Sequence, residues 1–219
     1  MITNAENNLA DTHSVLHRRN IPTQKRSTET YNLILDTAAN LLGEVGINGF
    51  NTNLLAEHAG IRIGTIYRYF PNKLAILSAL VERWANLMRE KLVSVGDLAD
   101  PTKDWREIIC NFIDIYNSTA QVVPGFFAIR RAMQAAPELR TIEKDMVRDI
   151  SLYIALAVKK RGSVLSKERI MTLIEIVLMA GAAVFDLARL RGRKDVTMKA
   201  EILEELKVMT ISYLSNYFD

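Results

Sequence analysis

Two very short helical segments, separated by a glycine turn, restrict the possible folds of this chain more than any other feature. Thr52 is a suitable N-cap for the segment TNLLAEHAG, and Gly60 ends that segment after about two turns. A second short segment, IGTIYRYF, begins near Ile63. Helices of this length are marginally stable alone. The pattern therefore predicts a helix-turn-helix packed on a neighbouring helix.

Longer helices are predicted on both sides of this pair. Apolar residues recur from Ile34 to Val45 at the spacing of one helical face, and Gly43 and Gly46 close that helix. After the pair, Asn72 caps a helix that continues to about Val95. The first helix and the short pair together predict a three-helix domain.

The second short helix has distinct inner and outer faces. Its spacing directs Ile63, Ile66 and Phe70 inward. The outer surface then carries Arg62, Thr65, Tyr67, Arg68 and Tyr69.

The rest of the chain continues as helices separated by proline and glycine. Five prolines and ten glycines in 219 residues are too few for the turns of an all-β chain. We therefore predict an all-α fold with a mobile arm (1–26), a helix-turn-helix domain (27–73) and a C-terminal helical domain (74–219). The helices expected in the C-terminal domain after the one that Asn72 caps cover residues 102–120, 124–134, 136–160, 166–191 and 196–217.

Residues 28–77 contain a dense set of small, aromatic and polar residues at fixed spacing. They include Thr52, Ala56, Ala59, Gly60, Gly64, Thr65, Tyr67, Tyr69, Phe70 and Lys73. In these positions the chain resembles the DNA-binding domain of the tetracycline-repressor (TetR) family of bacterial transcription regulators. It departs from the family pattern most clearly at Arg62, where the family often has serine.

The resemblance implies roles for nine residues of this region. Thr52, Thr65, Tyr67, Tyr69 and Lys73 are expected to contact phosphates or position the helix. Arg62, Ile63, Gly64 and Arg68 are expected to face base edges, where arginine can read guanine. In an alternative interpretation, one of the two tyrosines, Tyr69 more readily than Tyr67, packs its ring in the core of the small domain.

The resemblance also implies that the last two helices, 166–191 and 196–217, pair with those of a second copy in a four-helix bundle. The alternative is that both helices belong to the core of one chain. A helix-turn-helix in a monomer reads only one half-site, which favours the homodimer.

The resemblance further implies a ligand-binding cavity in the C-terminal domain. The candidate lining residues are Trp84, Met88, Trp105, Phe112, Tyr116, Phe126, Phe127, Met133, Met146, Tyr153 and Glu175. Aromatic and methionine side chains at helical spacing are more often part of the core than of a pocket, so core packing is the alternative interpretation for each of them. If Glu175 is buried, its carboxylate needs a partner, which could be Arg130, Arg131 or a ligand atom. In the alternative interpretation, Glu175 forms a purely structural ion pair or lies at the edge of its helix.

Enzymatic, metal and cofactor chemistry find little support in the sequence. The three histidines are His13 and His17 in the arm and His58 on the first short helix, so neither a catalytic triad nor a zinc site is indicated. Cys110 lies among apolar residues and fits a small core residue better than a thiol sensor. We therefore expect no enzyme, no metal and no cofactor.

Composition and hydropathy favour a cytoplasmic protein. The net charge of +3 and the single cysteine are compatible with a polyanionic partner and a reducing compartment. No secretory segment is evident at the N-terminus. The apolar stretch 170–190 contains Glu175, Asp186 and Arg189, which predicts a helix buried in protein rather than in a membrane.

The resemblance, taken with these observations, implies a homodimeric, ligand-responsive regulator, a repressor released from a palindromic operator in double-stranded DNA by a small, largely apolar molecule. Two other classes remain open. A helical small-molecule-binding protein with vestigial DNA binding would show no salt-sensitive DNA binding, and an architectural protein would bind DNA without sequence preference.

Overall fold

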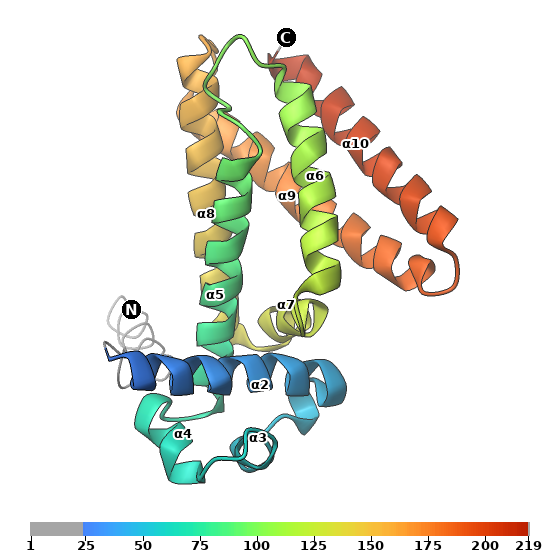
Figure 1. Cartoon of the computed structure of the whole chain (residues 1–219). Coiled ribbons are helices and arrows are strands. Elements are labelled where there is room, and N and C mark those ends of the chain that lie inside the picture. The colour runs from blue at the N-terminus through green and yellow to red at the C-terminus, as the bar shows by residue number, and fades with distance from the viewer. Residues whose placement is uncertain (1–23, 219) are drawn as a thin grey trace, which may run out of the picture. The chain divides into compact units, whose positions relative to one another are not determined.

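The computed structural model describes residues 24–218 (Figure 1). These residues form helices and no strands. The all-α prediction is confirmed for these residues. Most of the predicted arm, with His13 and His17, lies outside them. The helices are α2 (Lys25–Gly49), α3 (Thr52–His58), α4 (Ile63–Tyr69), α5 (Lys73–Ser94), α6 (Trp105–Val122), α7 (Phe126–Ala135), α8 (Pro137–Lys160), α9 (Lys167–Gly192) and α10 (Val196–Phe218).

Residue contacts divide the chain into two compact units. Unit 1 comprises the described residues up to Asn86 together with Ala120–Lys144. Unit 2 comprises Leu87–Thr119 and the described residues from Asp145 onward. Residues 120–144, which include α7, therefore pack with the helix-turn-helix region.

The core of unit 1 forms around α2. Ile34, Leu41 and Leu42 of this helix are buried, as are Ile66 and Phe70 at the end of α4. Two of the three side chains predicted to point inward from α4 are therefore buried, and the third, Ile63, is half-buried. In Figure 1, α7 lies on the side of α2 opposite to α3 and α4.

Gly125 allows α7 to approach α2 closely. This residue is the N-cap of α7 and has a left-handed backbone with φ 67°. A Cβ atom at this position would lie 2.2 Å from the carbonyl oxygen of Ala39 in α2. Only glycine fits both the conformation and the contact.

The helix ends match the predicted signals with two corrections, at the start of α3 and at the end of α2. Asn51, and not Thr52, is the N-cap of α3, because its side chain accepts a hydrogen bond from the amide of Leu54 at 2.9 Å. Asn72 caps α5 through the amide of Ala75, as predicted, and Ser166 caps α9 through the amide of Arg169. Gly60 has φ 64° after α3, the left-handed conformation that ends a helix.

The first helix ends later than Gly43 suggests. Gly43 is helical, and the break occurs at Gly46, with φ 66° and ψ −179° inside α2. Glycine propensity alone does not stop a helix whose apolar face is packed, whereas the left-handed backbone at Gly46 does interrupt it.

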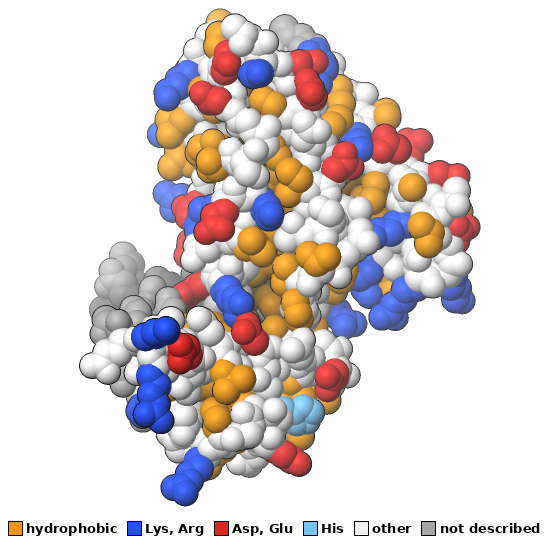
Figure 2. All heavy atoms as spheres, viewed as in Figure 1, with side chains coloured by type: hydrophobic (Ala, Val, Ile, Leu, Met, Phe, Trp, Pro, Cys, Tyr) orange, Lys and Arg blue, Asp and Glu red, His pale blue; other side chains and the backbone are white. Residues whose placement is uncertain are grey.

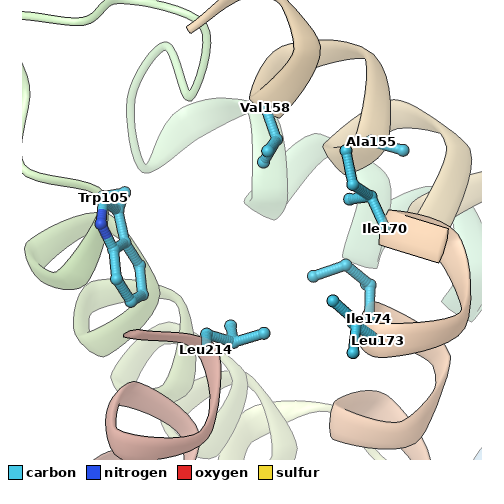
Figure 3. Packing of buried hydrophobic residues seen from close by; sticks show 7 residues of the cluster. All are labelled: Trp105, Ala155, Val158, Ile170, Leu173, Ile174 and Leu214. Atoms are coloured by element: carbon cyan, nitrogen blue, oxygen red, sulfur yellow. The ribbon is translucent and has the colours of Figure 1, made fainter. Parts of the chain in front are cut away.

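Unit 2 is built around the antiparallel pair α9 and α10. Seven buried side chains from four helices point toward a common centre (Figure 3). They are Trp105 of α6, Ala155 and Val158 of α8, Ile170, Leu173 and Ile174 of α9, and Leu214 of α10. A second cluster contains Ile113, Phe185, Ala188, Leu203 and Leu206.

Helix α9 is only partly covered within one chain. Large apolar side chains remain exposed on it at Ile176, Met179, Leu187 and Leu190. By length and composition α9 is the one helix in the described residues that could cross a membrane. The predicted burial of this stretch in protein is therefore incomplete in a single chain.

Candidate nucleic-acid interface

The hydroxyl groups of Thr52 and Tyr67 connect α3 to α4. Their oxygen atoms are 3.2 Å apart, at hydrogen-bond distance. Tyr67 is 40% exposed, and Thr52 is half-buried at the start of α3. Two hydroxyls side by side on an accessible surface can donate hydrogen bonds to phosphate oxygens.

Tyr69 differs from Tyr67 in that its side chain is only 2% exposed. Its ring lies edge-on to Tyr31 with 6.0 Å between the centroids, and Tyr31 in turn stacks on Phe70. The prediction that Tyr69 lies on the outer surface of α4 is wrong, because its ring packs in the core of unit 1. The alternative interpretation, in which Tyr69 packs in this core, is the one the structure shows.

Arg68 contacts the buried tyrosine in two ways. Its Nη2 donates a hydrogen bond to the Tyr69 hydroxyl at 2.9 Å. Its guanidinium carbon lies 4.9 Å from the centre of the same ring, within the range of a cation–π contact. The side chain is exposed, but its direction is set by Tyr69.

Arg62 is the N-cap of α4 and carries no such restraint. Its backbone is extended, and its side chain makes no capping hydrogen bond. Gly64, two residues later, is exposed, and a Cβ atom added to it would have no heavy atom within 4 Å. Ile63 and Thr65 are half-buried between these exposed positions.

Lys73 anchors the start of α5 to the turn that follows the break in α2. Its ammonium group donates to the carbonyl oxygen of Ile47 at 2.5 Å and lies 6.0 Å from the centre of the Phe50 ring. Burial lowers the pKa of this ammonium below its usual value. Lys73 therefore has a structural contact in addition to its predicted contact with phosphate.

The predicted DNA-contacting residues lie on α3, on α4 and at the start of α5. Figure 2 shows basic side chains over α4. Hydroxyls suited to phosphate and an arginine suited to a base edge are therefore presented by neighbouring helices of unit 1.

The predicted ligand-binding residues do not fall in one unit. Trp84, Phe126, Phe127 and Met133 belong to unit 1, and the other seven belong to unit 2. In unit 1, the Trp84 and Phe126 rings meet edge to face at 5.6 Å. In unit 2, Tyr116 packs on Phe185 at 4.2 Å between the ring centres.

Glu175 and Tyr153 are not fully buried in a single chain. Glu175 is half-buried on α9, which matches the alternative of a glutamate at the helix edge. Tyr153 is exposed on α8. Arg130, one of the two partners suggested for Glu175, is buried in unit 1, whereas Glu175 belongs to unit 2.

Two buried hydroxyls were missed by the sequence analysis. Ser151 of α8 and Thr210 of α10 are buried, and their side-chain oxygens have no hydrogen-bond partner among the described residues. Each lies one helical turn before a member of the unit 2 core, Ala155 and Leu214 respectively. The only signal in the sequence is their position on the apolar faces of these helices.

Metal and thiol chemistry remain without support in the described residues. No group of three or more potential metal ligands occurs among them. Cys110 is half-buried, and burial raises the pKa of its thiol. A raised pKa lowers the thiolate fraction, which fits a core residue better than a reactive sensor.

Known sequence families match most of the chain. Residues 34–80 match the family described as "Bacterial regulatory proteins, tetR family". Residues 103–218 match the family described as "Tetracyclin repressor-like, C-terminal domain". These two matches include all the helices except the first part of α2 and the second part of α5.

Curated relatives match in part of their length. The class A tetracycline repressor from transposon 1721 of Escherichia coli is 38% identical over 78 residues, 36% of this chain and 34% of the repressor. The HTH-type transcriptional regulator EthR of Mycobacterium tuberculosis is 35% identical over 106 residues, 47% of this chain and 46% of EthR. The chain thus matches a third to a half of the length of these relatives.

Solved structures share the fold over most of the chain. A TetR-family transcriptional regulator from Streptomyces coelicolor superposes with a TM-score of 0.67 at 23% identity, covering 88% of this chain and 99% of its own. A TetR-family regulator from Haemophilus influenzae gives a TM-score of 0.62 at 19% identity, with 84% and 97% covered.

Proposed function

The chain belongs to the TetR family and is a DNA-binding transcriptional regulator rather than an enzyme, and we propose that it is a cytoplasmic, homodimeric repressor that a small molecule releases from a palindromic operator. The observation that carries the proposal is the surface of α3 and α4. There, Arg62, Thr52 and Tyr67 present a guanidinium and two hydroxyls to the exterior.

Within this surface we assign two kinds of contact. Thr52, Thr65, Tyr67 and Lys73 contact phosphates and fix the position of the recognition helix α4. Residues at the start of α4 face the base edges in the major groove. Tyr69 supports this arrangement through its buried ring.

The dimer is proposed to form through α9 and α10. Exposed apolar side chains on α9, including Leu187 and Leu190, would be covered by a second copy, as would Val208 and Met209 of α10. Protein rather than lipid is the better cover for α9, because Asp186 and Arg189 interrupt its apolar sequence. Two copies also supply the two recognition helices that a palindrome requires.

The effector is proposed to be small and largely apolar. Aliphatic and aromatic side chains form the interior of unit 2, and the buried Ser151 and Thr210 hydroxyls of this unit have no hydrogen-bond partner among the described residues. Binding of the effector would favour a conformer with lower operator affinity, and α5, which runs through both units, is the proposed connection.

Selection from random duplex DNA by the purified full-length protein tests this function. We expect enrichment of an inverted repeat, and fluorescence anisotropy on that repeat should show affinity that falls steeply with salt. Binding without sequence preference would support an architectural protein instead. Absence of salt-sensitive binding by folded protein would support a small-molecule-binding protein with vestigial DNA binding.

A further inference from the structure

We propose that Arg62 selects a guanine in each half of the operator and that Arg68 reads no base. This inference rests on the proposed function, because it concerns how the same surface recognises its operator. Arg62 precedes α4 and Arg68 lies near its end, and both side chains are exposed. Either guanidinium could in principle form paired hydrogen bonds to guanine O6 and N7.

The direction of Arg68 is fixed by the core of unit 1. Its Nη2 donates to the Tyr69 hydroxyl at 2.9 Å, and its guanidinium stacks 4.9 Å from the ring centre. The ring cannot follow the arginine outward, because Tyr69 is buried against Tyr31. Extension of Arg68 to a base edge would therefore break both contacts.

Arg62 has a fixed backbone and an unrestrained side chain. Its carbonyl oxygen accepts a hydrogen bond from the amide of Thr65 at 2.8 Å, which holds the start of α4. Its guanidinium makes no hydrogen bond or ion pair with any other described residue. Reading a base with Arg62 therefore breaks no contact of the described chain.

The neighbouring residues leave room for a base edge. Gly64 is exposed and has no side chain that would separate the helix from the groove. The N-terminal residues of a recognition helix are those that contact base edges in the major groove, and Arg62 is at that end. Arg68 lies at the opposite end of α4, where its charge is available to phosphate.

Guanine is the base that this geometry favours. Its O6 and N7 are two acceptors in the plane of the base, and they match two parallel N–H groups of a guanidinium. Adenine presents an amino donor in place of O6, and it would leave one N–H group without an acceptor. A lysine at position 62 would keep the charge but lose the paired geometry.

Base-substituted operators test the assignment. The operator selected by the wild type is changed one base pair at a time, and each duplex is titrated with the full-length wild type, Arg62→Ala, Arg62→Lys and Arg68→Ala. We expect the wild type to prefer guanine at one position of each half-site by about 10-fold or more. Arg62→Ala should remove that preference and keep the preferences at other positions.

The matched variants separate base reading from charge. Arg62→Lys should keep the salt dependence of the wild type but lose most of the guanine preference. Arg68→Ala should weaken binding to all the duplexes by a similar factor, because a phosphate contact carries no sequence information. Circular dichroism and sedimentation confirm that each variant is a folded assembly like the wild type.

Two results would overturn the assignment while the proposed function stands. One is a guanine preference that survives in Arg62→Ala, and the other is a guanine preference that disappears in Arg68→Ala. If the wild type enriches no inverted repeat at all, the proposed function itself fails and the inference fails with it.

Discussion

Gly125 and Gly60 have nearly the same backbone conformation in different surroundings. Their φ angles are 67° and 64°, and both lie in the left-handed region. At Gly60 nothing lies within 4 Å of a Cβ position, whereas at Gly125 the carbonyl oxygen of Ala39 lies 2.2 Å from it. The pair thus separates the cost of the conformation from the cost of the close contact.

Alanine substitutions at these two glycines should therefore differ. Gly60→Ala should lower the free energy of unfolding by about 1 to 2 kcal/mol, the cost of a left-handed alanine. Gly125→Ala adds the overlap with α2 and should lower it by about 2 to 5 kcal/mol. Urea unfolding of both variants measures the difference, and equal losses would contradict the close packing of α7 on α2.

Tyr67 and Lys73 should contribute differently to stability although both are assigned to phosphates. Tyr67→Ala should lower operator affinity by about 10-fold and change the unfolding midpoint little, because the side chain is 40% exposed. Lys73→Ala should lower affinity and also stability, since it removes the bond to the Ile47 carbonyl.

Anisotropy with the selected operator and urea unfolding give the two readouts for these variants. Sedimentation is the control, because neither change should affect the dimer. Dissociation of either variant into monomers would argue against the separate roles assigned to unit 1 and to the α9 and α10 surface.

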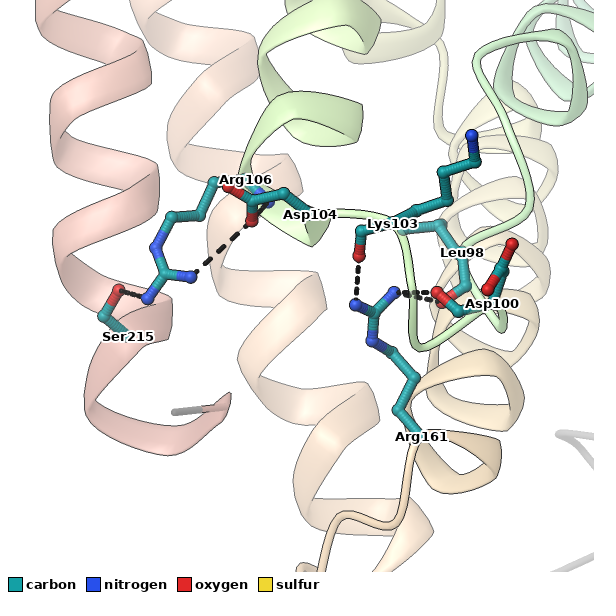
Figure 4. Close-up of polar contacts among 7 residues, drawn as sticks. All are labelled: Leu98, Asp100, Lys103, Asp104, Arg106, Arg161 and Ser215. Atoms are coloured by element: carbon teal, nitrogen blue, oxygen red, sulfur yellow. Dashed lines mark hydrogen bonds and ion pairs between the residues drawn. The ribbon is translucent and has the colours of Figure 1, made fainter.

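At the scale of elements, one arginine holds the long connection between α5 and α6. Arg161, just after α8, donates to the carbonyl oxygens of Leu98 and Asp100 at 3.1 and 2.9 Å, and to that of Lys103 (Figure 4). Leu98 itself is buried in unit 2. Turn hydrogen bonds shape the connection internally, and Arg161 ties it to the end of α8.

Removal of this arginine should release the connection. Arg161→Ala leaves three carbonyl groups without their donor and should lower the free energy of unfolding by about 1 to 3 kcal/mol. Amide hydrogen exchange of residues 96–104 should accelerate while that of α9 and α10 stays slow. Arg161→Lys keeps the charge but loses the forked guanidinium, so its stability and exchange rate should lie between those of the wild type and Arg161→Ala. Unchanged exchange in Arg161→Ala would contradict the anchoring role.

The elements themselves were largely predictable from the sequence. The caps at Asn72, Ser166 and Asp195 act locally, and the structure shows each of them accepting an amide hydrogen bond. The apolar spacing of α4 identified Ile66 and Phe70 as core for the same reason. Local hydrogen bonding and helical periodicity are properties of short segments, so they can be read without the fold.

Contacts between distant segments could not be predicted in this way. The packing of α7 on α2 depends on Gly125 and Ala39, which are separated in the sequence by α3, α4, α5 and α6. The bond between Arg68 and Tyr69 likewise depends on Tyr31 holding the tyrosine ring inside. Spacing gave Tyr69 an exposed position because periodicity describes one helix and not the neighbours that cover it.

At the scale of the whole molecule, affinity for a palindrome depends on assembly. One helix-turn-helix contacts one half-site, and a second copy held nearby binds the other half-site at a high effective concentration. The exposed apolar side chains of α9 are proposed to provide that link. A charge introduced among them would be buried in the dimer without a partner and would oppose assembly.

Leu187→Glu should therefore yield a folded monomer with operator affinity lower by about 100-fold. Leu187 is 45% exposed in one chain, so the monomer should keep the helical content of the wild type. Val164→Glu is the matched control, because Val164 is 96% exposed and lies in the connection between α8 and α9.

Sedimentation velocity gives the assembly state, and anisotropy compares the full operator with a single half-site. For Leu187→Glu the two duplexes should bind equally weakly, since only one recognition helix is available to each. A dimeric Leu187→Glu with full operator affinity would show that copies of this chain meet through a different surface. A monomeric Leu187→Glu that keeps full operator affinity would instead remove the link between assembly and recognition.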